Sequence, residues 1–214
     1  MAELFKTIGS TVLRVRCDDH LLRQAQGVLD SAATFAHTEN GLSPGVTIQF
    51  GWSLLMLWPD GDLLAICEPD FDGDALRAFR DDVSCTLEVV TLQTQFLRQL
   101  GIEAGSLRFD EKVVFKRGAL SECRIYAERQ ASAPGDSGWY VGPADDTTPP
   151  TTEALTACRV YELLRLRPSL LPALALPEGF LVVFNGDAVE AVLDPGNENR
   201  WPGDAGMWQS APFS

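Results

Sequence analysis

The spacing of apolar and polar residues along the 214-residue chain predicts a mixture of short strands and helices. Runs in which apolar and polar residues alternate, or which are rich in Val, Ile and aromatic residues, are typical of strands. Gly51 lies inside one such run, where a glycine predicts a bend or a bulge. Turns at Pro59–Asp62 and Gly186–Asp187 join neighbouring runs into hairpins. We therefore expect strands over residues 8–16, 45–58, 63–67, 112–117, 123–128, 179–185 and 189–194.

Two long segments have helical spacing. The first begins at Asp18, whose short acceptor side chain suits the start of a helix, and ends before Gly41. Its apolar stripe consists of Leu21, Ala25, Val28, Leu29, Ala32 and Phe35. The second covers residues 83–101 and is apolar around much of its circumference, which is typical of a buried helix. Gly101 is placed to end it.

Three shorter segments are also expected to be helical. One follows the acidic stretch 68–74 and ends near Asp82, and another covers residues 152–166, where Ala154, Cys158 and Tyr161 recur at helical spacing. A helical turn, broken by prolines, is expected within the segment RPSLLPALALPEG, residues 167–179.

These elements predict an α+β protein of two small mixed domains, each a mainly antiparallel sheet packed with helices. A chain of this length suits one large domain or two small ones. The change between the halves falls between Gly101 and Lys112, so we expect an N-terminal domain over residues 1–105 and a C-terminal domain over 106–214. The C-terminal domain ends in an irregular tail that carries Trp201 and Trp208; these aromatics are expected to pack onto the body, with a role as partner anchors as the alternative.

Charge narrows the range of partners. The sequence has 17 Lys and Arg against 30 Asp and Glu, a formal net charge of −13. Nucleic acid and anionic membrane surfaces would repel such a chain, whereas a basic protein would associate with it faster. We therefore expect neither nucleic acid nor a membrane as partner. Acidity that serves only solubility is the alternative.

The five cysteines, Cys17, Cys67, Cys85, Cys123 and Cys158, are widely spaced and odd in number. Metal sites and disulfide frameworks favour tighter patterns, so these cysteines are expected to be small buried residues in a reducing cytoplasm. The N-terminal stretch MAELFKTIGS has no basic segment followed by an apolar run, so no signal peptide is expected. The longest apolar runs are too short to span a membrane.

Candidate catalytic and metal-binding patterns are weak. The stretch DFDGD, residues 70–74, lacks the glycine and glutamate spacing of a calcium-binding loop. Ser137 lacks the sequence context of a hydrolase nucleophile, and the chain has only His20 and His37 as possible bases. Phosphate-binding glycine motifs are absent from the sequence. We therefore expect no enzyme activity, no metal and no cofactor, and a function in binding; an uncharacterised hydrolase remains an alternative.

The stretch PGDSGWYVG, residues 134–142, places a turn before a strand in which Trp139 and Val141 alternate with Tyr140. Downstream lie a helix with Tyr161, the segment RPSLLPALALPEG and a strand that ends in FNGD. Over residues 110–195 this arrangement resembles the bacterial immunity-protein domain numbered thirty-three among polymorphic-toxin systems, formerly a domain of unknown function. The structural signature is Asp136, Ser137, Gly138 and Trp139, and Trp139 is expected to be a core residue. The Thr- and Pro-rich loop ADDTTPPTT departs from the family pattern.

The resemblance implies an antitoxin: a cytoplasmic protein that binds and neutralises a cognate secreted effector toxin, often one from a type VI or contact-dependent system. Charge adds the expectation of a basic toxin such as a nuclease. The chain is expected to be a monomer or to form a 1:1 heterodimer with the toxin. An effector-specific chaperone or adaptor of a secretion system is the alternative. The toxin-contacting residues are expected to be carboxylates of the hairpin end, the acidic stretch and the loop after Val141: Asp60, Asp62, Glu68, Asp70, Asp72, Asp74, Asp145 and Asp146.

Overall fold

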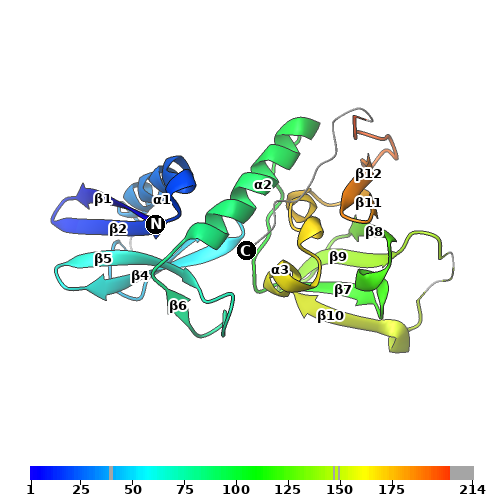
Figure 1. Ribbon diagram of the computed structural model, residues 1–214, viewed down its shortest axis with the longest axis horizontal. Coiled ribbons are helices and arrows are strands. Elements are labelled where there is room, and N and C mark those ends of the chain that lie inside the picture. The colour runs from blue at the N-terminus through cyan, green and yellow to red at the C-terminus, as the bar shows by residue number, and fades with distance from the viewer. Residues whose placement is uncertain (39–40, 147, 149, 203–214) are drawn as a thin grey trace. The chain divides into compact units, whose positions relative to one another are not determined.

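The computed structural model describes residues 1–38, 41–146, 148 and 150–202. The chain divides into two compact units, Met1–Thr91 and Leu92–Ser214, and each unit contains one mixed β-sheet with helices (Figure 1). The predicted α+β class is therefore confirmed. The expected domain boundary between residues 105 and 106 stays a prediction about which parts of the chain fold independently. Trp208, one of the tail aromatics, lies outside the described residues.

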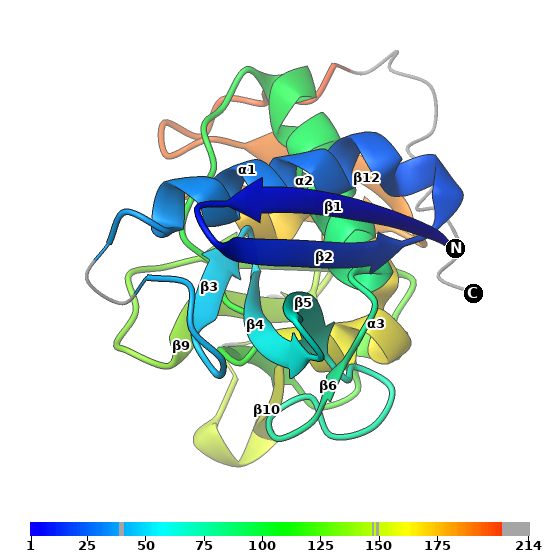
Figure 2. The same ribbon diagram turned by 90° about the vertical axis from the view of Figure 1, so that its left-hand side faces the viewer.

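The first unit is built on a sheet in which the strands have the order β1-β2-β5-β4-β3, and β6 pairs with β5. The β2 and β5 strands are parallel and the other pairs are antiparallel. Helix α1, Leu22–Phe35, lies along β1 and β2 (Figure 2). The strands are β1 Ala2–Ile8, β2 Thr11–Cys17, β3 Thr47–Phe50, β4 Ser53–Asp60, β5 Leu63–Pro69 and β6 Phe79–Arg80.

One face of this sheet packs against α1. Leu13, Leu57 and Ile66 from three strands are at most 1% exposed and share a core with Ala25 and Leu29 of the helix. The predicted apolar stripe of α1 is confirmed, since its alanines, valine and leucines are buried and Phe35 packs against the same core. Burial of this stripe is what holds the helix on the sheet, because apolar area removed from water is the main favourable contribution to folding.

The second unit contains a six-stranded sheet of order β10-β7-β9-β8-β11-β12. The β7 and β9 strands are parallel and the remaining pairs are antiparallel. Besides α3, Leu163–Leu166, short 3-10 helices connect the strands, two of them within residues 168–175. The strands are β7 Lys112–Lys116, β8 Arg124–Arg129, β9 Asp136–Pro143, β10 Leu155–Arg159, β11 Leu181–Asn185 and β12 Ala188–Leu193.

The two faces of the second sheet differ. Alternate residues such as Ile125, Trp139 and Val182 are at most 1% exposed and form the core with leucines of residues 168–176. The residues between them, Tyr126 and Tyr140 among them, are half-buried and lie on the opposite face. This period-2 alternation follows from strand geometry, in which successive side chains point to opposite sides.

Helix α2, Ser84–Leu100, confirms the expected long helix. The division between the two units falls inside it, between Thr91 and Leu92. Gly101 has a φ of 67°, and the N–H of Ile102 donates to the Leu97 carbonyl, 3.0 Å away. A left-handed glycine followed by this bond is the Schellman ending of a helix, so the predicted stop is confirmed.

The N-terminal half contains more strands than predicted. Residues 8–16 were expected to form one strand, but Gly9 and Ser10 form a turn between β1 and β2. Likewise 45–58 is a hairpin, because Gly51 and Trp52 form a tight turn between β3 and β4 instead of a bend within one strand.

Three predicted helical boundaries are wrong. Asp18 precedes a 3-10 turn, Asp19–Leu21, and its side chain makes no cap hydrogen bond. The segment before Asp82 contains the short strand β6 instead of a helix. Residues 155–159 form β10, paired along its whole length with β7, and only Leu163–Leu166 are α-helical. Sheet pairing here overrides the helical spacing of the alanines, since strand preference depends on the tertiary neighbours.

Candidate functional site

The hairpin end of the first unit carries Asp60 and Asp62. Asp60 closes β4 and its carboxylate lies 2.6 Å from a guanidinium nitrogen of Arg14. Asp62 is exposed in the turn between β4 and β5 and makes no ion pair with a described residue. The two expected contact residues therefore differ: Asp62 presents a free charge, whereas Asp60 already neutralises an arginine that is 8% exposed.

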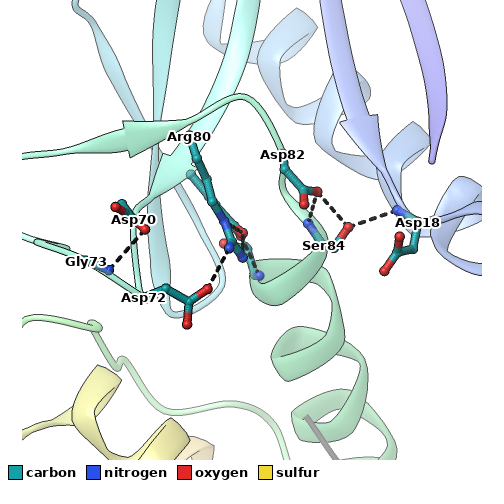
Figure 3. Close-up of polar contacts among 9 residues, drawn as sticks. Asp18, Asp70, Asp72, Gly73, Arg80, Asp82 and Ser84 are labelled. Atoms are coloured by element: carbon teal, nitrogen blue, oxygen red, sulfur yellow. Dashed lines mark hydrogen bonds and ion pairs between the residues drawn. The ribbon is translucent and has the colours of Figure 1, made fainter. Parts of the chain in front are cut away.

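The acidic loop, residues 70–78, connects β5 to β6. Its turn is held by Asp70, whose side chain accepts a hydrogen bond of 3.1 Å from the N–H of Gly73. Asp72 lies 3.0 Å from Arg80 (Figure 3). Asp74 lies 3.8 Å from Arg77. The loop is anchored by Phe71, which stacks on the buried Trp52 with ring centroids 5.0 Å apart. The carboxylates of this loop are thus presented from a packed segment.

Glu68 is the exception among the expected contact residues. Its side chain is fully buried, so it is not available on this surface, and its predicted role as a partner contact is corrected to a structural one. One carboxylate oxygen accepts hydrogen bonds of 2.9 and 2.7 Å from Arg80. The other accepts a bond of 2.7 Å from the N–H of Thr86 in the first turn of α2 (Figure 3). Free N–H groups at a helix start favour a carboxylate partner.

Burial raises the pKa of Glu68 to about 7, although Arg80 and the Thr86 N–H favour the charged form. Beside it, the side chain of Asp82 accepts hydrogen bonds from the N–H and the hydroxyl of Ser84, and the Ser84 hydroxyl accepts one from the N–H of Asp18 (Figure 3). The polar groups around the start of α2 therefore serve the fold of the first unit.

In the second unit, Asp145 and Asp146 follow strand β9. Asp145 is 76% exposed at its side chain and lies 2.6 Å from Arg124, which also pairs with Glu190. Asp146 pairs with Lys116, and this ion pair lowers the pKa of its carboxyl group. Both expected contact residues are on the surface, and each is neutralised by a cation of the same sheet.

The Asp-Ser-Gly-Trp segment opens β9. The side chain of Asp136 accepts a hydrogen bond of 2.9 Å from the N–H of Gly138, and the hydroxyl of Ser137 donates one of 2.6 Å to the carbonyl of Lys112. Gly138 has a φ of 77°, and a Cβ there would collide with the carbonyl oxygen of Gln130. Only glycine fits this close backbone approach.

Trp139 is a core residue, as expected, at 1% exposure. Its indole N–H donates a hydrogen bond of 2.9 Å to the carbonyl of Leu174, and the Arg129 guanidinium carbon lies 5.9 Å from its ring centroid. Arg129 in turn donates to the carbonyls of Leu176 and Ser106. The segment thus ties β9 to the leucine-rich segment 167–179.

A cavity of about 400 Å³ lies on the half-buried face of the second sheet, beside this segment. The phenol rings of Tyr126 and Tyr140 lie 5.8 Å apart at their centroids and form part of its wall. Two carboxylate residues, Glu128 and Asp136, also line it. Further lining residues are Val114, Gln130, Ala131, Ser132, Gly138, Trp139, Pro150 and Leu155.

The geometry does not assemble a catalytic or metal centre from the residues considered. Ser137 is 1% exposed and bonded to a backbone carbonyl, and both histidines are exposed outside the strands. Among residues 1–38, 41–146, 148 and 150–202, no group of three or more His, Cys, Asp and Glu could hold a metal ion. In the same part of the chain, no helix is both long and apolar enough to cross a membrane.

All five cysteines are free thiols. Cys17, Cys67 and Cys158 are buried, as predicted, and Cys85 is partly covered. Cys123 is exposed, which corrects the expectation that every cysteine is buried.

Residues 92–195 match the Imm33-like domain. The range contains both the Asp-Ser-Gly-Trp segment and the segment 167–179, so the resemblance found in the sequence is confirmed for this part of the chain: residues 92–195, in the second unit, match a domain of an immunity-protein family. Comparisons with curated proteins and with solved structures found no match.

The tyrosine-lined cavity was not among the sequence-based predictions. The available signal was the alternation in CRIYAE, which places Tyr126 and Glu128 on the same face of a strand. Their meeting with Tyr140 depends on the register between β8 and β9, in which Glu128 lies opposite Tyr140. No residue spacing along the chain specifies that register.

Proposed function

We propose that this protein is an immunity protein that binds a cognate secreted effector toxin and neutralises it by direct occlusion. The single observation that carries the proposal is the match of residues 92–195 to the Imm33-like domain. In this role the protein binds its partner, and its own side chains need not catalyse a reaction. The protein acts in the cytoplasm of the cell that makes it, as one molecule of the chain on one toxin.

The toxin is proposed to be basic. The chain carries a net charge of −13, and complementary charge speeds association and disfavours wrong partners. A nuclease delivered by a type VI secretion system fits this chemistry, since a cleft that holds nucleic acid is lined with cations. An acidic surface can occupy such a cleft in place of the phosphates.

The proposed contacts are surface carboxylates, of which Asp70 and Asp146 are half-buried and the others exposed. In the first unit these include Asp62 and Asp70, which make no ion pair with a described residue, together with Asp60, Asp72 and Asp74. In the second unit they are Asp145 and Asp146. Both residues of the second group already pair with a cation of their own unit, as do Asp60, Asp72 and Asp74. A toxin must therefore compete with these cations. The exposed pair of Asp145 and Arg124 is weak, so exchange there costs little. Asp60 faces the largely buried Arg14, which Asp81 would still neutralise.

Co-expression tests the proposal. The protein encoded by the adjacent gene is expressed in a sensitive host with and without this chain. The proposal expects growth arrest without the chain, survival with it, and no protection against an unrelated toxin. Survival of the host with the adjacent protein alone would mean that this protein is not a toxin, and would contradict the proposal. A complex in which the toxin stays fully active would instead favour the chaperone or adaptor role.

A further inference from the structure

The half-buried face of the second sheet presents a row of side chains from neighbouring strands. Val114 of β7 lies opposite Tyr140 of β9, and Tyr140 lies opposite Glu128 of β8. Tyr126 is two residues before Glu128 and therefore shares its face. Half-buried aromatic and carboxylate side chains thus stand side by side in the centre of the sheet, around the cavity of about 400 Å³.

The two tyrosines form a fixed wall. Their rings lie 5.8 Å apart at their centroids with an interplanar angle of 57°, and partial burial raises the pKa of both phenols. The rings therefore stay neutral at physiological pH and keep their electron-rich faces. Such faces attract a guanidinium or ammonium group placed within about 6 Å of the ring.

The carboxylates of the cavity lack cations. Neither Glu128 nor Asp136 makes an ion pair with a described residue, and the cavity lining contains no Lys or Arg. By contrast, Asp145 and Asp146 are each paired with a cation of the same sheet. Glu128 and Asp136 are therefore carboxylates of this face that are free to pair with an external cation.

We propose that this cavity receives an arginine or lysine side chain of the toxin, held by the Glu128 and Asp136 carboxylates against the rings of Tyr126 and Tyr140. The inference rests on the proposed function, and it names the docking point on the Imm33-like domain. A cation is attracted both by the negative carboxylates and by the faces of the aromatic rings, whereas an anion would be repelled by the carboxylates. A hard metal ion would need more oxygen ligands than these two carboxylates supply.

The signature segment acquires a second role in this proposal. The same Asp136 that lines the cavity also holds the N–H of Gly138, and the close approach of Gly138 to Gln130 sets one edge of the opening. The tight turn therefore places a carboxylate at a defined position beside the tyrosines.

The first test needs no toxin. Nitrogen-15 and aromatic-carbon NMR spectra of the full chain are recorded during titration with N-acetyl-arginine methylamide. The proposal expects saturable shifts at Tyr126 and Tyr140, and at least a tenfold loss of affinity in Glu128→Gln. The control Glu122→Gln makes the same charge change before the start of β8, about 20 Å away along the strand. Absence of saturable shifts, or equal affinity in the two variants, overturns the proposal.

The aromatic wall is tested separately. Tyr140→Phe keeps the ring and is expected to bind the arginine derivative within about threefold of the wild type, whereas Tyr140→Leu loses at least tenfold. Circular dichroism of both variants checks that the sheet is intact. Equal affinity of the Phe and Leu variants would show that the aromatic ring does not contribute to binding and would overturn the proposal.

The final arm uses the adjacent gene's product as the toxin. If the wild-type chain binds and neutralises it, Glu128→Gln should weaken binding at least tenfold and Glu122→Gln should leave it unchanged. If the wild type neutralises the toxin and both variants equal it, the cavity proposal fails while the proposed function stands. If the wild type neither binds nor neutralises it, the proposed function fails, and the cavity as toxin docking point fails with it.

Discussion

The indole N–H of Trp139 donates a hydrogen bond of 2.9 Å to the backbone carbonyl of Leu174, 35 residues further along the chain. This bond joins the two sequence segments that carry the resemblance to the immunity-protein family. Both segments lie in the Imm33-like domain, and their contact gives the pair a physical meaning. The Trp139 side chain is buried, so this residue of the motif shapes the core of the second unit.

Replacement of Trp139 by Phe is expected to lower the free energy of unfolding by about 2 kcal/mol. The smaller ring leaves a cavity and the Leu174 carbonyl loses a buried donor. Urea unfolding followed by circular dichroism measures the change. The matched control is Trp58→Phe, since Trp58 is 54% exposed and should cost less than about 0.5 kcal/mol. Equal costs for the two variants would contradict the assignment of Trp139 as an anchor.

Gly138→Ala is expected to destabilise the protein by about 2 kcal/mol or more. The left-handed backbone disfavours any side chain, and the new methyl group would collide with the Gln130 carbonyl. Gly118→Ala provides the comparison, because Gly118 has a similar φ of 87° but open space around it. It should cost only about 1 kcal/mol. A Gly138 cost no larger than that of Gly118 would show that the close approach is unimportant.

Glu68 makes a prediction for pH dependence. Its pKa in the folded protein is raised from an ordinary 4.5 to about 7, so the unfolded state releases the proton first. The stability that this group contributes is therefore complete below pH 4.5 and is lost as the pH rises through 7. Over that range the loss amounts to about 3 kcal/mol.

The measurement compares the wild type with Glu68→Gln by urea unfolding at pH 5 and pH 8. Gln mimics the protonated acid, so the wild type should lose stability relative to the variant as the pH rises. All other titrating groups are common to both proteins and cancel in the difference. If the wild type instead becomes more stable relative to the variant between pH 5 and pH 8, the attraction between Glu68 and Arg80 outweighs the cost of burying the charge.

Thiol reactivity should single out Cys123. It is exposed, whereas Cys17, Cys67 and Cys158 are buried, and burial raises the pKa of Cys67 to about 11 and that of Cys158 to about 12. Because the thiolate is the reactive form, a chromogenic disulfide reagent should label one thiol quickly in the native protein. Cys123→Ser should abolish that fast phase. A fast phase that survives in this variant would contradict the described exposures.

Periodicity predicted the elements that are stabilised by their own amphipathic pattern. Helix α1 buries its expected stripe, and α2 ends at Gly101 as its left-handed glycine requires. The failures are segments whose state depends on a distant partner. Leu155–Arg159 has helical spacing and becomes a strand because it pairs with β7. Residues 8–16 belong to two strands and not to one, because the alternating stretch AELFKTI is itself a strand that ends at the Gly9 turn.

The charge pattern predicted which carboxylates are exposed less well than the apolar periodicity predicted the long helices. The run of carboxylates in residues 68–74 gives no sign that Glu68 is buried while Asp72 and Asp74 are exposed, since that depends on Arg80 and on the start of α2. The cavity beside Tyr140 could not be predicted from the sequence either. Its walls come from different strands, and the residues that face each other are set by the register between those strands.

The most direct test of the account is a titration of the adjacent gene's toxin with the purified chain, in which binding and toxin activity are measured in the same samples. The account predicts that activity falls in proportion to complex formed and reaches zero at one chain per toxin. A saturated complex with undiminished toxin activity, or no complex at all, would contradict it.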